Sequence, residues 1–223
     1  MCTSHYAEDA LMHKIRDIMC GRFKLTKKQQ EVVDRYNAEV ERLFEEMYNA
    51  SPTQNLPVVT NEKPDKIQFF RWGLIPYWAK EIAIGNKMFN ARAETIREKP
   101  SFKIPFQRRR CLVPADGFYE WKKLAEGKKQ PYVITLKSDA LFSFAGLWDV
   151  WKNPDGDSIN SFTIITTTPN SLMTDIHDRM PVILKREDEK IWLDKNTKTE
   201  DVFSLLKPFN AEEMKVEMIS KVG

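Results

Sequence analysis

Residues 110–121 read RCLVPADGFYEW, a pattern that predicts two strands joined by a turn. Apolar residues fill positions 111–115, and Asp116-Gly117 is a dipeptide that favours a tight turn. Working outward from this stretch, further strands are predicted at residues 57–60, 67–72, 132–136, 141–151, 161–167, 182–184 and 216–219. Because helices are expected mainly toward the two ends of the chain, the sequence predicts an α+β fold. We expect a single domain with a largely antiparallel, curled, barrel-like sheet flanked by helices.

The longest predicted helix lies near the N-terminus. Thr26 and Gln29 form a capping-box pattern, and apolar residues at helical spacing continue to Met47, which predicts a helix of about five turns. Shorter helices are expected at residues 94–99, 171–176, 187–193 and 200–206. A turn is expected at residues 153–156, between two long strands.

The composition narrows the class of protein. The chain has 223 residues, of which 42% are hydrophobic and 30% charged, as in a globular domain with a proper core. The net charge of +3 does not by itself demand a nucleic-acid partner. Cys2, Cys20 and Cys111 lie far apart, which argues against a disulfide scaffold or a structural zinc site, and no cofactor is predicted. No apolar run reaches about 18 residues, so we expect a cytoplasmic protein without a membrane span.

Met19-Cys20 is the most reactive stretch that the sequence offers. If translation starts at Met19, removal of that methionine leaves Cys20 with a free amine beside its thiol. The two groups have reference pKa values of about 8 and about 8.5, so either can be nucleophilic near neutral pH. Both can close on one aldehyde carbon, the amine as a Schiff base and the thiol to complete a thiazolidine ring. The alternative is a buried cysteine beside a turn glycine.

Seven short motifs then occur in order along the chain. They are MCGR (19–22), WGLIP (72–76), NARAE (90–94), RCLVP (110–114), GFYEW (117–121), AGLW (145–148) and HDRMP (177–181). Together they resemble the SOS response-associated peptidase (SRAP) family throughout residues 19–220. The resemblance implies a single α+β domain that binds single-stranded DNA and links covalently to abasic sites through a terminal cysteine. It also implies a proposed peptidase activity that removes the residues preceding the cysteine.

The resemblance implies a catalytic set of Cys20, Asn90, Glu120 and His177. Cys20 matches the crosslinking nucleophile and Asn90 an asparagine that orients the sugar or the amine. Glu120 matches a glutamate that shuttles protons, and His177 a histidine that assists ring opening or Schiff-base chemistry. The chain departs from the family pattern because residues 1–18 precede Met19. We read them as a mis-assigned start or a propeptide, with the domain at residues 19–223. If they persist, Cys20 carries an amide and the thiazolidine cannot close.

The residues themselves give weaker reasons for the same roles. Glu120 lies between two aromatic residues, and burial would raise its pKa toward the operating pH, although a surface carboxylate is as common. His177 is the only histidine outside the doubtful extension, although most lone histidines are structural. Asn90 alternatively only stabilises a turn.

Predicted DNA contacts comprise cations for phosphates and flat groups for bases. They are Arg22, Arg71, Trp72, Pro76 and Arg92, of which the resemblance itself implies Arg22 and Arg92. Base stacking is worth about 1–3 kcal/mol per base. The alternative is that the aromatic residues are core and the arginines a solvated face.

For other residues in or near these motifs we expect either a DNA contact or a place in the core. Tyr77 and the arginine run 108–110 are further candidates for DNA contacts, whereas Trp121 and Trp148 are expected in the core. Cys111 is expected to be a buried, inert thiol.

Three functions follow from this reading. The first is covalent capture of abasic sites in single-stranded DNA by a monomer, bound to the nucleoid when on DNA, with abasic-site lyase activity as a side reaction. The second is a cysteine peptidase that removes its own N-terminal residues. The third is a non-covalent single-strand binding module.

Overall fold

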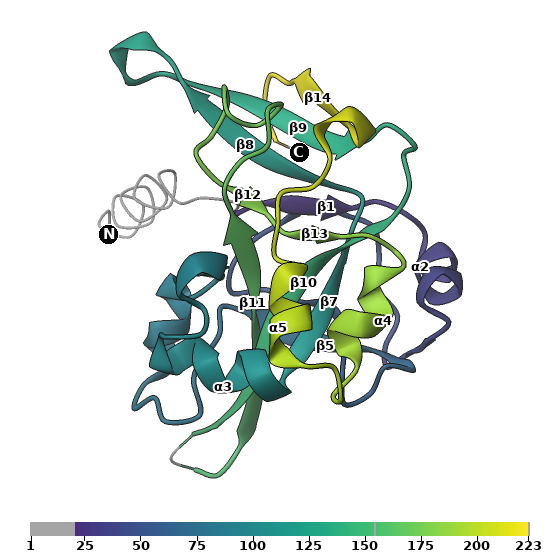
Figure 1. Ribbon diagram of the computed structural model, residues 1–223, viewed down its shortest axis with the longest axis vertical. Helices are drawn as coiled ribbons and strands as arrows, with labels where there is room; N and C mark the ends of the chain where they lie inside the picture. The colour runs from purple at the N-terminus through teal and green to yellow at the C-terminus, as the bar shows by residue number, and fades with distance from the viewer. Residues whose placement is uncertain (1–20, 154, 223) are drawn as a thin grey trace, which may run out of the picture.

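The computed structural model describes residues 21–153 and 155–222, which form two β-sheets and a layer of helices (Figure 1). The smaller sheet has the strand order β14-β9-β8-β1-β3. Its strands are β14 (Met214–Met218), β9 (Lys129–Leu136), β8 (Gly117–Lys123), β1 (Phe23–Leu25) and β3 (Met47–Ala50).

The larger sheet has the order β12-β11-β10-β7-β4-β5-β2, with β6 also paired to β11 and β13 to β10. Its strands are β12 (Met180–Pro181), β11 (Ser158–Thr167), β10 (Phe142–Lys152), β7 (Arg110–Ala115), β4 (Asn55–Thr60), β5 (Lys66–Trp72), β2 (Glu39–Val40), β6 (Asn90–Arg92) and β13 (Ile183–Leu184). Most strand pairs are antiparallel, and β11–β5, β11–β6 and β2–β5 are parallel. The predicted α+β class and largely antiparallel pairing are confirmed.

The two predicted strands and the bend at Asp116-Gly117 are present, but the two strands do not pair with each other as a hairpin. β7 pairs with β10 and β4, whereas β8 pairs with β1 and β9, so the chain crosses from one sheet to the other at this point. Asp116 fixes the crossing, because its Oδ2 accepts hydrogen bonds from the backbone N and the Oγ1 of Thr26, at 3.0 and 2.6 Å. Glycine suits position 117, because a Cβ there would lie 2.9 Å from Cγ2 of Thr135 and 3.1 Å from the carbonyl oxygen of Ile134.

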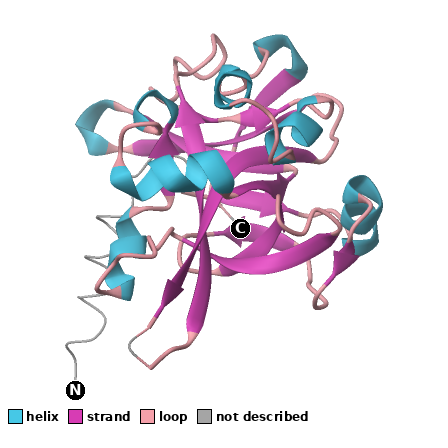
Figure 2. Cartoon of the chain, turned by 60° about the horizontal axis from the view of Figure 1, so that its bottom comes forward, coloured by secondary structure: helices cyan, strands magenta, loops and turns pink. Residues whose placement is uncertain are grey.

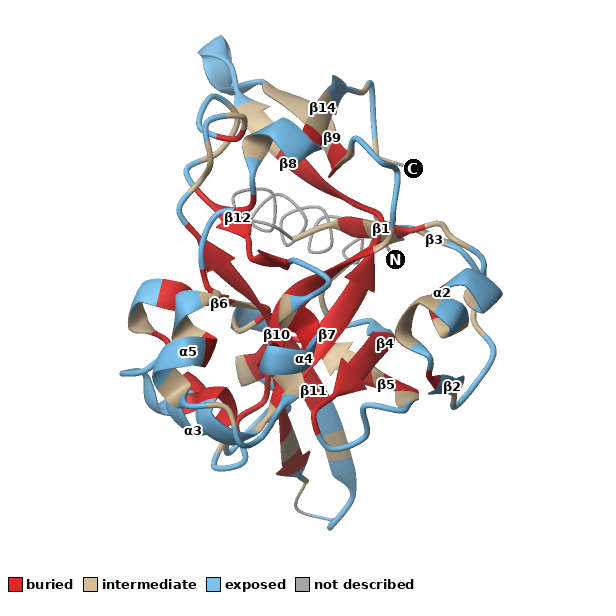
Figure 3. Cartoon of the chain, turned by 45° about the vertical axis from the view of Figure 1, so that its right-hand side comes forward, coloured by how far each residue is buried: buried red, intermediate tan, exposed pale blue. Residues whose placement is uncertain are grey.

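A first hydrophobic core fills the space between the two sheets. Phe23 and Phe118 come from the smaller sheet, and Val113, Phe144 and Phe162 from the larger one. The ring centroids of Phe23 and Phe144 are 5.7 Å apart, and those of Phe118 and Phe144 are 6.0 Å apart. The strands that face this core are buried along most of their length (Figure 3).

A second core lies on the other face of the larger sheet, under the helices (Figure 2). The helices are α2 (Gln29–Tyr36), α3 (Pro100–Arg108), α4 (Asp188–Leu193) and α5 (Thr199–Ser204), with the short 3₁₀ turns η1 (Ile82–Lys87), η2 (Ala93–Thr95), η3 (Ala125–Gly127) and η4 (Ala211–Glu213). Leu112 and Ala145 point into this second core, one residue along from side chains that face the first, as the alternation of a strand requires. Among the described residues, no helix is long and apolar enough to span a lipid bilayer.

The structure corrects the helix predictions in several places. The N-terminal helix ends at Tyr36 rather than Met47, because Asn37 adopts a left-handed conformation with φ of 48°. Residues 39–40 then pair with β5, so tertiary pairing overrides the helical periodicity. α3 was not predicted, and residues 171–176 form turns rather than a helix.

Candidate functional site

Glu120 lies on β8 at the place where the described chain begins. Glu120 is only 2% exposed. β1 runs antiparallel to β8 with Phe23 opposite Phe118, and the backbone N–H of Tyr119 donates to the carbonyl oxygen of Arg22 at 3.0 Å. Continuing this register by two residues brings Gly21 opposite Glu120. Cys20 lies outside the described residues, one peptide bond before Gly21.

Asn90 and Arg92 lie on β6, a short strand added to one edge of β11. The pairing is parallel, with Asn90 beside Ile164 and Arg92 beside Thr166. Asn90 is half-buried, and Arg92 is exposed. The strand therefore presents an amide near the interior and a cation at the surface, two residues apart.

Trp72 lies in the core and contacts both the start of β1, near Glu120, and the residue before Asn90. Its ring centroid lies 5.2 Å from that of Phe23 and 6.2 Å from that of Phe89, the residue before Asn90. Its Nε1–H donates to the carbonyl oxygen of Phe89 at 2.8 Å. Since Trp72 has no exposed surface, the prediction that its ring stacks on bases is wrong. The residue instead packs the start of β1 against the start of β6.

His177 lies in the loop between β11 and β12, with its side chain 19% exposed. Its Nδ1 lies 3.1 Å from the backbone N of Arg179 and 3.0 Å from Oδ1 of Asp178. The two contacts need opposite protonation states, since Nδ1 accepts from the amide but would have to donate to the carboxylate. Burial lowers the pKa of His177, the charges of Lys123 and Arg179 lower it further, and Asp178 opposes them. We therefore assign a neutral ring at pH 7, with Nδ1 accepting from the amide and the proton on Nε2.

An ion pair between buried Arg179 and exposed Glu94 ties the His177 loop to the segment that follows the Asn90 strand. Arg179 donates from Nη1 and Nη2 to the two carboxylate oxygens of Glu94, at 2.6 and 2.9 Å. Its Nη2 also donates to the carbonyl oxygen of Thr166 at 2.8 Å. The guanidinium lowers the pKa of Glu94. Because Glu94 follows β6 directly and Thr166 pairs with Arg92, the clamp brings the sites of Asn90, Arg92 and His177 together at one end of β11.

The two other arginines predicted to contact DNA, Arg22 and Arg71, are partly buried and already hydrogen-bonded within the protein. Arg22 is half-buried, and its Nη1 donates to Oδ1 of Asn49 at 3.1 Å. Arg71 donates to the carbonyl oxygen of Thr53 and to Oδ1 of Asn86, at 2.9 and 2.7 Å. Burial lowers the pKa of both guanidinium groups.

Pro76 is buried, so the prediction that it wedges between bases is wrong in this conformation. The exposed flat groups are the next two residues, with Tyr77 59% and Trp78 46% exposed. The backbone N–H of Tyr77 donates to Oδ2 of Asp149, and Nε1 of Trp151 donates to the carbonyl oxygen of Ala79 at 2.7 Å. Trp78 was missed from sequence, although an aromatic pair directly after a proline is a signal for an exposed loop.

The arginine run at residues 108–110 is mainly structural. Arg110 is 2% exposed, and Arg109 forms an ion pair with buried Asp149. Only Arg108 is exposed. The run therefore does not form the basic patch that the sequence suggested.

Cys111 is fully buried, as predicted. Burial raises the pKa of its thiol far above the usual range, so it is not a nucleophile near neutral pH. Within the described part of the chain, no group of three or more potential ligand side chains is placed to hold a metal ion.

The chain is similar to known proteins over most of its length. The chain is 47% identical over 209 residues to the abasic site processing protein YoqW of Bacillus subtilis, covering 92% of this chain and 93% of that protein. It is 36% identical over 203 residues to the abasic site processing protein HMCES of Rattus norvegicus, covering 73% of this chain and 58% of that protein. A crystal structure of a protein from Bacteroides thetaiotaomicron has a TM-score of 0.85 and 36% identity, and covers 90% of this chain and 92% of that one. The model of the SOS response associated peptidase (SRAP) family matches residues 19–222, and the chain belongs to this family.

Proposed function

We propose that this protein binds single-stranded DNA as a monomer and captures abasic sites covalently through Cys20, in the response to DNA damage. The relatives named as abasic site processing proteins support this proposal. The observation that carries it is the β1–β8 register with Phe23 opposite Phe118, which, extended by two residues, brings Gly21 to the position opposite buried Glu120. A terminal cysteine would then have a proton-transfer group next to it.

The proposed reaction needs no oxidant or cofactor. The closed sugar of an abasic site opens to an aldehyde, and the free amine of Cys20 adds to its carbon. Loss of one water molecule gives a Schiff base, and the thiol then adds to the same carbon while its proton passes to nitrogen. The product is a thiazolidine, and the balance is aldehyde plus cysteine giving ring plus water. Proton abstraction from the Schiff-base stage would lead to β-elimination, which is the proposed lyase side reaction.

Each side chain at the site has a proposed role in these steps. Glu120 takes the proton from the amine or thiol and returns it to the leaving water. His177, neutral with its proton on Nε2, donates a hydrogen bond to the sugar oxygen as the ring opens. Asn90 orients the sugar or the amine. Arg22, Arg71 and Arg92 would hold phosphates, and binding would therefore weaken as salt rises.

Tyr77 and Trp78 take over the stacking role first expected of Trp72 and Pro76. Asp149 and Trp151 fix the backbone of their loop, so two exposed rings stand on a rigid support. A base stacked on either ring would contribute without regard to sequence.

The covalent step is tested with an oligonucleotide that carries one abasic site. We expect protein that starts at Met19 to give an adduct that survives denaturing electrophoresis, and Cys20→Ala to give none. Cys111→Ser is the matched control, because its thiol is buried and should not contribute. An adduct in Cys20→Ala, or none in the parent protein, would contradict the proposal.

Self-processing is a second proposed activity, because residues 1–18 precede Met19-Cys20. The thiol of Cys20 would add to the carbonyl carbon of Met19, and the Met19–Cys20 amide would break to give a thioester and the free amine of Cys20, with Glu120 moving the proton. Water would then hydrolyse the thioester and release residues 1–19. Mass spectrometry of the purified full-length chain should show loss of the first 19 residues, and this loss should stop in Glu120→Ala. An intact full-length mass would argue against processing while leaving covalent capture unaffected.

A further inference from the structure

The arginines of this chain differ in what their guanidinium groups bind. One group forms ion pairs with carboxylates and comprises Arg35, Arg97, Arg109 and Arg179. Arg22 and Arg71 differ from these, because their hydrogen-bond acceptors are neutral. The acceptors are Oδ1 of Asn49 for Arg22, and Oδ1 of Asn86 and the carbonyl oxygen of Thr53 for Arg71. Among the described residues, neither arginine forms an ion pair, so both keep an uncompensated positive charge.

A neutral acceptor and a carboxylate have different consequences for a guanidinium group. Both fix its direction through a hydrogen bond, but only the carboxylate neutralises its charge. Burial lowers the pKa of Arg22 and Arg71, because a half-buried cation without an anion is less well solvated. N–H groups that these hydrogen bonds do not use remain on both side chains. A guanidinium that is oriented but not neutralised suits an anionic ligand such as a phosphate group.

One short segment, from Asn49 to Thr53, contacts both guanidinium groups. Nη1 of Arg22 lies 3.1 Å from Oδ1 of Asn49, and Nη1 of Arg71 lies 2.9 Å from the carbonyl oxygen of Thr53. Four residues span at most about 14 Å, so the backbone positions of the two acceptors are close together.

The packing of the core supports the same arrangement. Phe23 directly follows Arg22, Trp72 directly follows Arg71, and the centroids of the two rings are 5.2 Å apart. The backbone N–H of Thr53 also donates to the carbonyl oxygen of Trp72 at 2.8 Å. The two arginines therefore belong to one rigid part of the molecule.

A ligand can reach both arginines. In the β1–β8 register Arg22 comes opposite Tyr119, whose backbone N–H donates to its carbonyl oxygen. Trp121 lies two residues further along β8 and shares this face. Trp121 is half-buried, so the prediction that it belongs to the core is wrong, and the face is partly open to solvent. The partner of Arg71 is also accessible, since Asn86 is exposed.

We propose that Asn49 and Asn86 are positioning residues, which hold Arg22 and Arg71 as a phosphate seat for single-stranded DNA. The two amides fix the directions of the guanidinium groups and leave their charges for the phosphodiester groups of the strand. An arginine with only a structural role gains more from a carboxylate partner, as the ion-paired arginines of this chain have. The inference deepens the proposed function and rests on it, because it takes single-stranded DNA as the ligand.

The isosteric double variant Asn49→Asp/Asn86→Asp tests the phosphate seat in the full-length chain. Each aspartate keeps the acceptor oxygen but adds a negative charge that neutralises its arginine. The measurement is the Kd for an intact single-stranded oligonucleotide at several salt concentrations. Losing two phosphate contacts should reduce the slope of log K against log salt by about 1.4, since each contact on a single strand contributes about 0.7. The parent slope in this variant would overturn the proposal.

The variant Asn49→Ala/Asn86→Ala separates orientation from charge. It removes both amide acceptors but leaves the two arginines charged. Binding should therefore weaken at every salt concentration while the slope stays near that of the parent. Parent affinity in this variant would show that the amides do not position the arginines, and it would also overturn the proposal.

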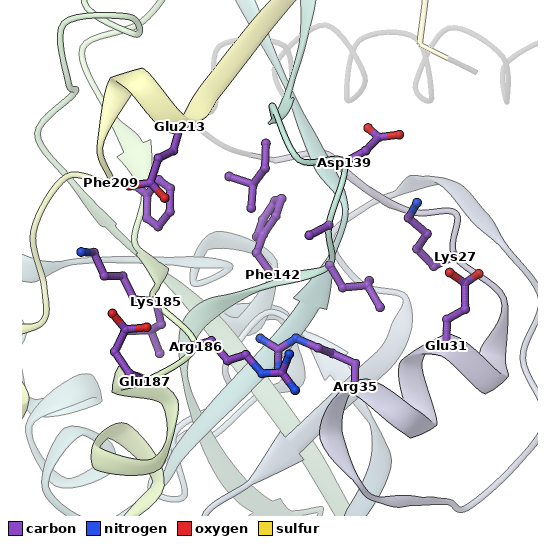
Figure 4. A pocket seen from close by; sticks show the side chains of 14 residues that line it. Lys27, Glu31, Arg35, Asp139, Phe142, Lys185, Arg186, Glu187, Phe209 and Glu213 are labelled. Atoms are coloured by element: carbon purple, nitrogen blue, oxygen red, sulfur yellow. The ribbon is translucent and has the colours of Figure 1, made fainter.

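A charge-matched control removes two lysines elsewhere on the surface. Lys27 and Lys185 line a groove of about 540 Å³ between α2, the β9–β10 connection and the start of α4 (Figure 4). The variant Lys27→Gln/Lys185→Gln changes the net charge by the same amount as the two aspartates and should keep the parent slope. An equal fall in slope in both variants would show a general charge effect and overturn the phosphate seat.

Stability and crosslinking separate the remaining outcomes. Each new aspartate faces a guanidinium group, so the melting temperature of the aspartate variant should stay unchanged or rise. A lower melting temperature with the parent slope would show that the amides are only structural and overturn the seat. If the parent protein crosslinks to abasic DNA but the aspartate variant keeps the parent slope, the seat fails alone. If the parent neither binds nor crosslinks, the proposed function and the seat fail together.

Discussion

Trp72 illustrates what one side chain does for this site. From the sequence, Trp72 could equally be a surface residue that stacks on bases or a core residue. Its indole packs between Phe23 and Phe89 and bonds the carbonyl of Phe89, which sets the spacing between the cysteine end of β1 and Asn90. Periodicity cannot reveal this, because the partners are 49 and 17 residues away and meet only when both sheets are formed.

His177 gives a pH prediction at the same scale. Its pKa is lowered in the folded protein, mainly by burial. The contribution of this ring to stability is therefore full above the unfolded pKa of about 6.5 and is lost as pH falls through the folded pKa. We expect the unfolding free energy of His177→Gln, measured with urea, to decline less than the parent's as pH falls below about 6.5. Parallel pH profiles for the two proteins would contradict the prediction.

At the scale of elements, the site depends on strand pairings that local sequence patterns do not predict. β6 is three residues long and joins β11 in parallel, while the His177 loop is turns rather than the predicted helix. The clamp from Arg179 to Glu94 and Thr166 holds these two segments together. Long strands such as β10 and β11 were predicted well because both are long runs rich in apolar, aromatic or β-branched residues with a turn between them. The short strands depend on their neighbours, and sequence alone gives no register.

The clamp should matter for catalysis more than for stability. Glu94→Gln keeps the shape of the side chain but removes the charge that Arg179 pairs with, so the His177 loop should loosen. We expect slower adduct formation and a shifted NMR signal for the His177 ring, assigned by its disappearance in His177→Gln. Glu200→Gln is the control, since Glu200 forms an exposed pair with Arg97 and should change neither readout. A Glu94→Gln protein with the parent rate and the parent imidazole signal would show that the clamp does not position the loop.

At the scale of the whole molecule, the helices pack on one face of the larger sheet, and Arg110 lies buried in this contact. Its guanidinium donates to the carbonyl oxygens of Phe106, Gln107, Trp192 and Asp194, at 2.6–3.1 Å. These carbonyls close the C-terminal ends of α3 and α4 over β7, where helices have carbonyl groups without partners of their own. The sequence showed only a run of three arginines, and the contacts that divide them into a buried, a paired and an exposed residue come from the tertiary structure.

This division gives a prediction for the molecule as a whole. Arg110→Met keeps much of the side-chain volume but leaves four carbonyl groups without their donor, two of them in buried hydrogen bonds, so we expect the unfolding free energy to fall by roughly 3 kcal/mol. Arg108→Met, two residues earlier and exposed, should change it by no more than about 0.5 kcal/mol. Urea denaturation measures both. Equal stabilities of the two variants would mean that the helical layer docks through its apolar contacts alone. Because Arg110 lies under the helices rather than among the proposed DNA contacts, folded Arg110→Met should also retain the parent salt dependence of binding to single-stranded DNA.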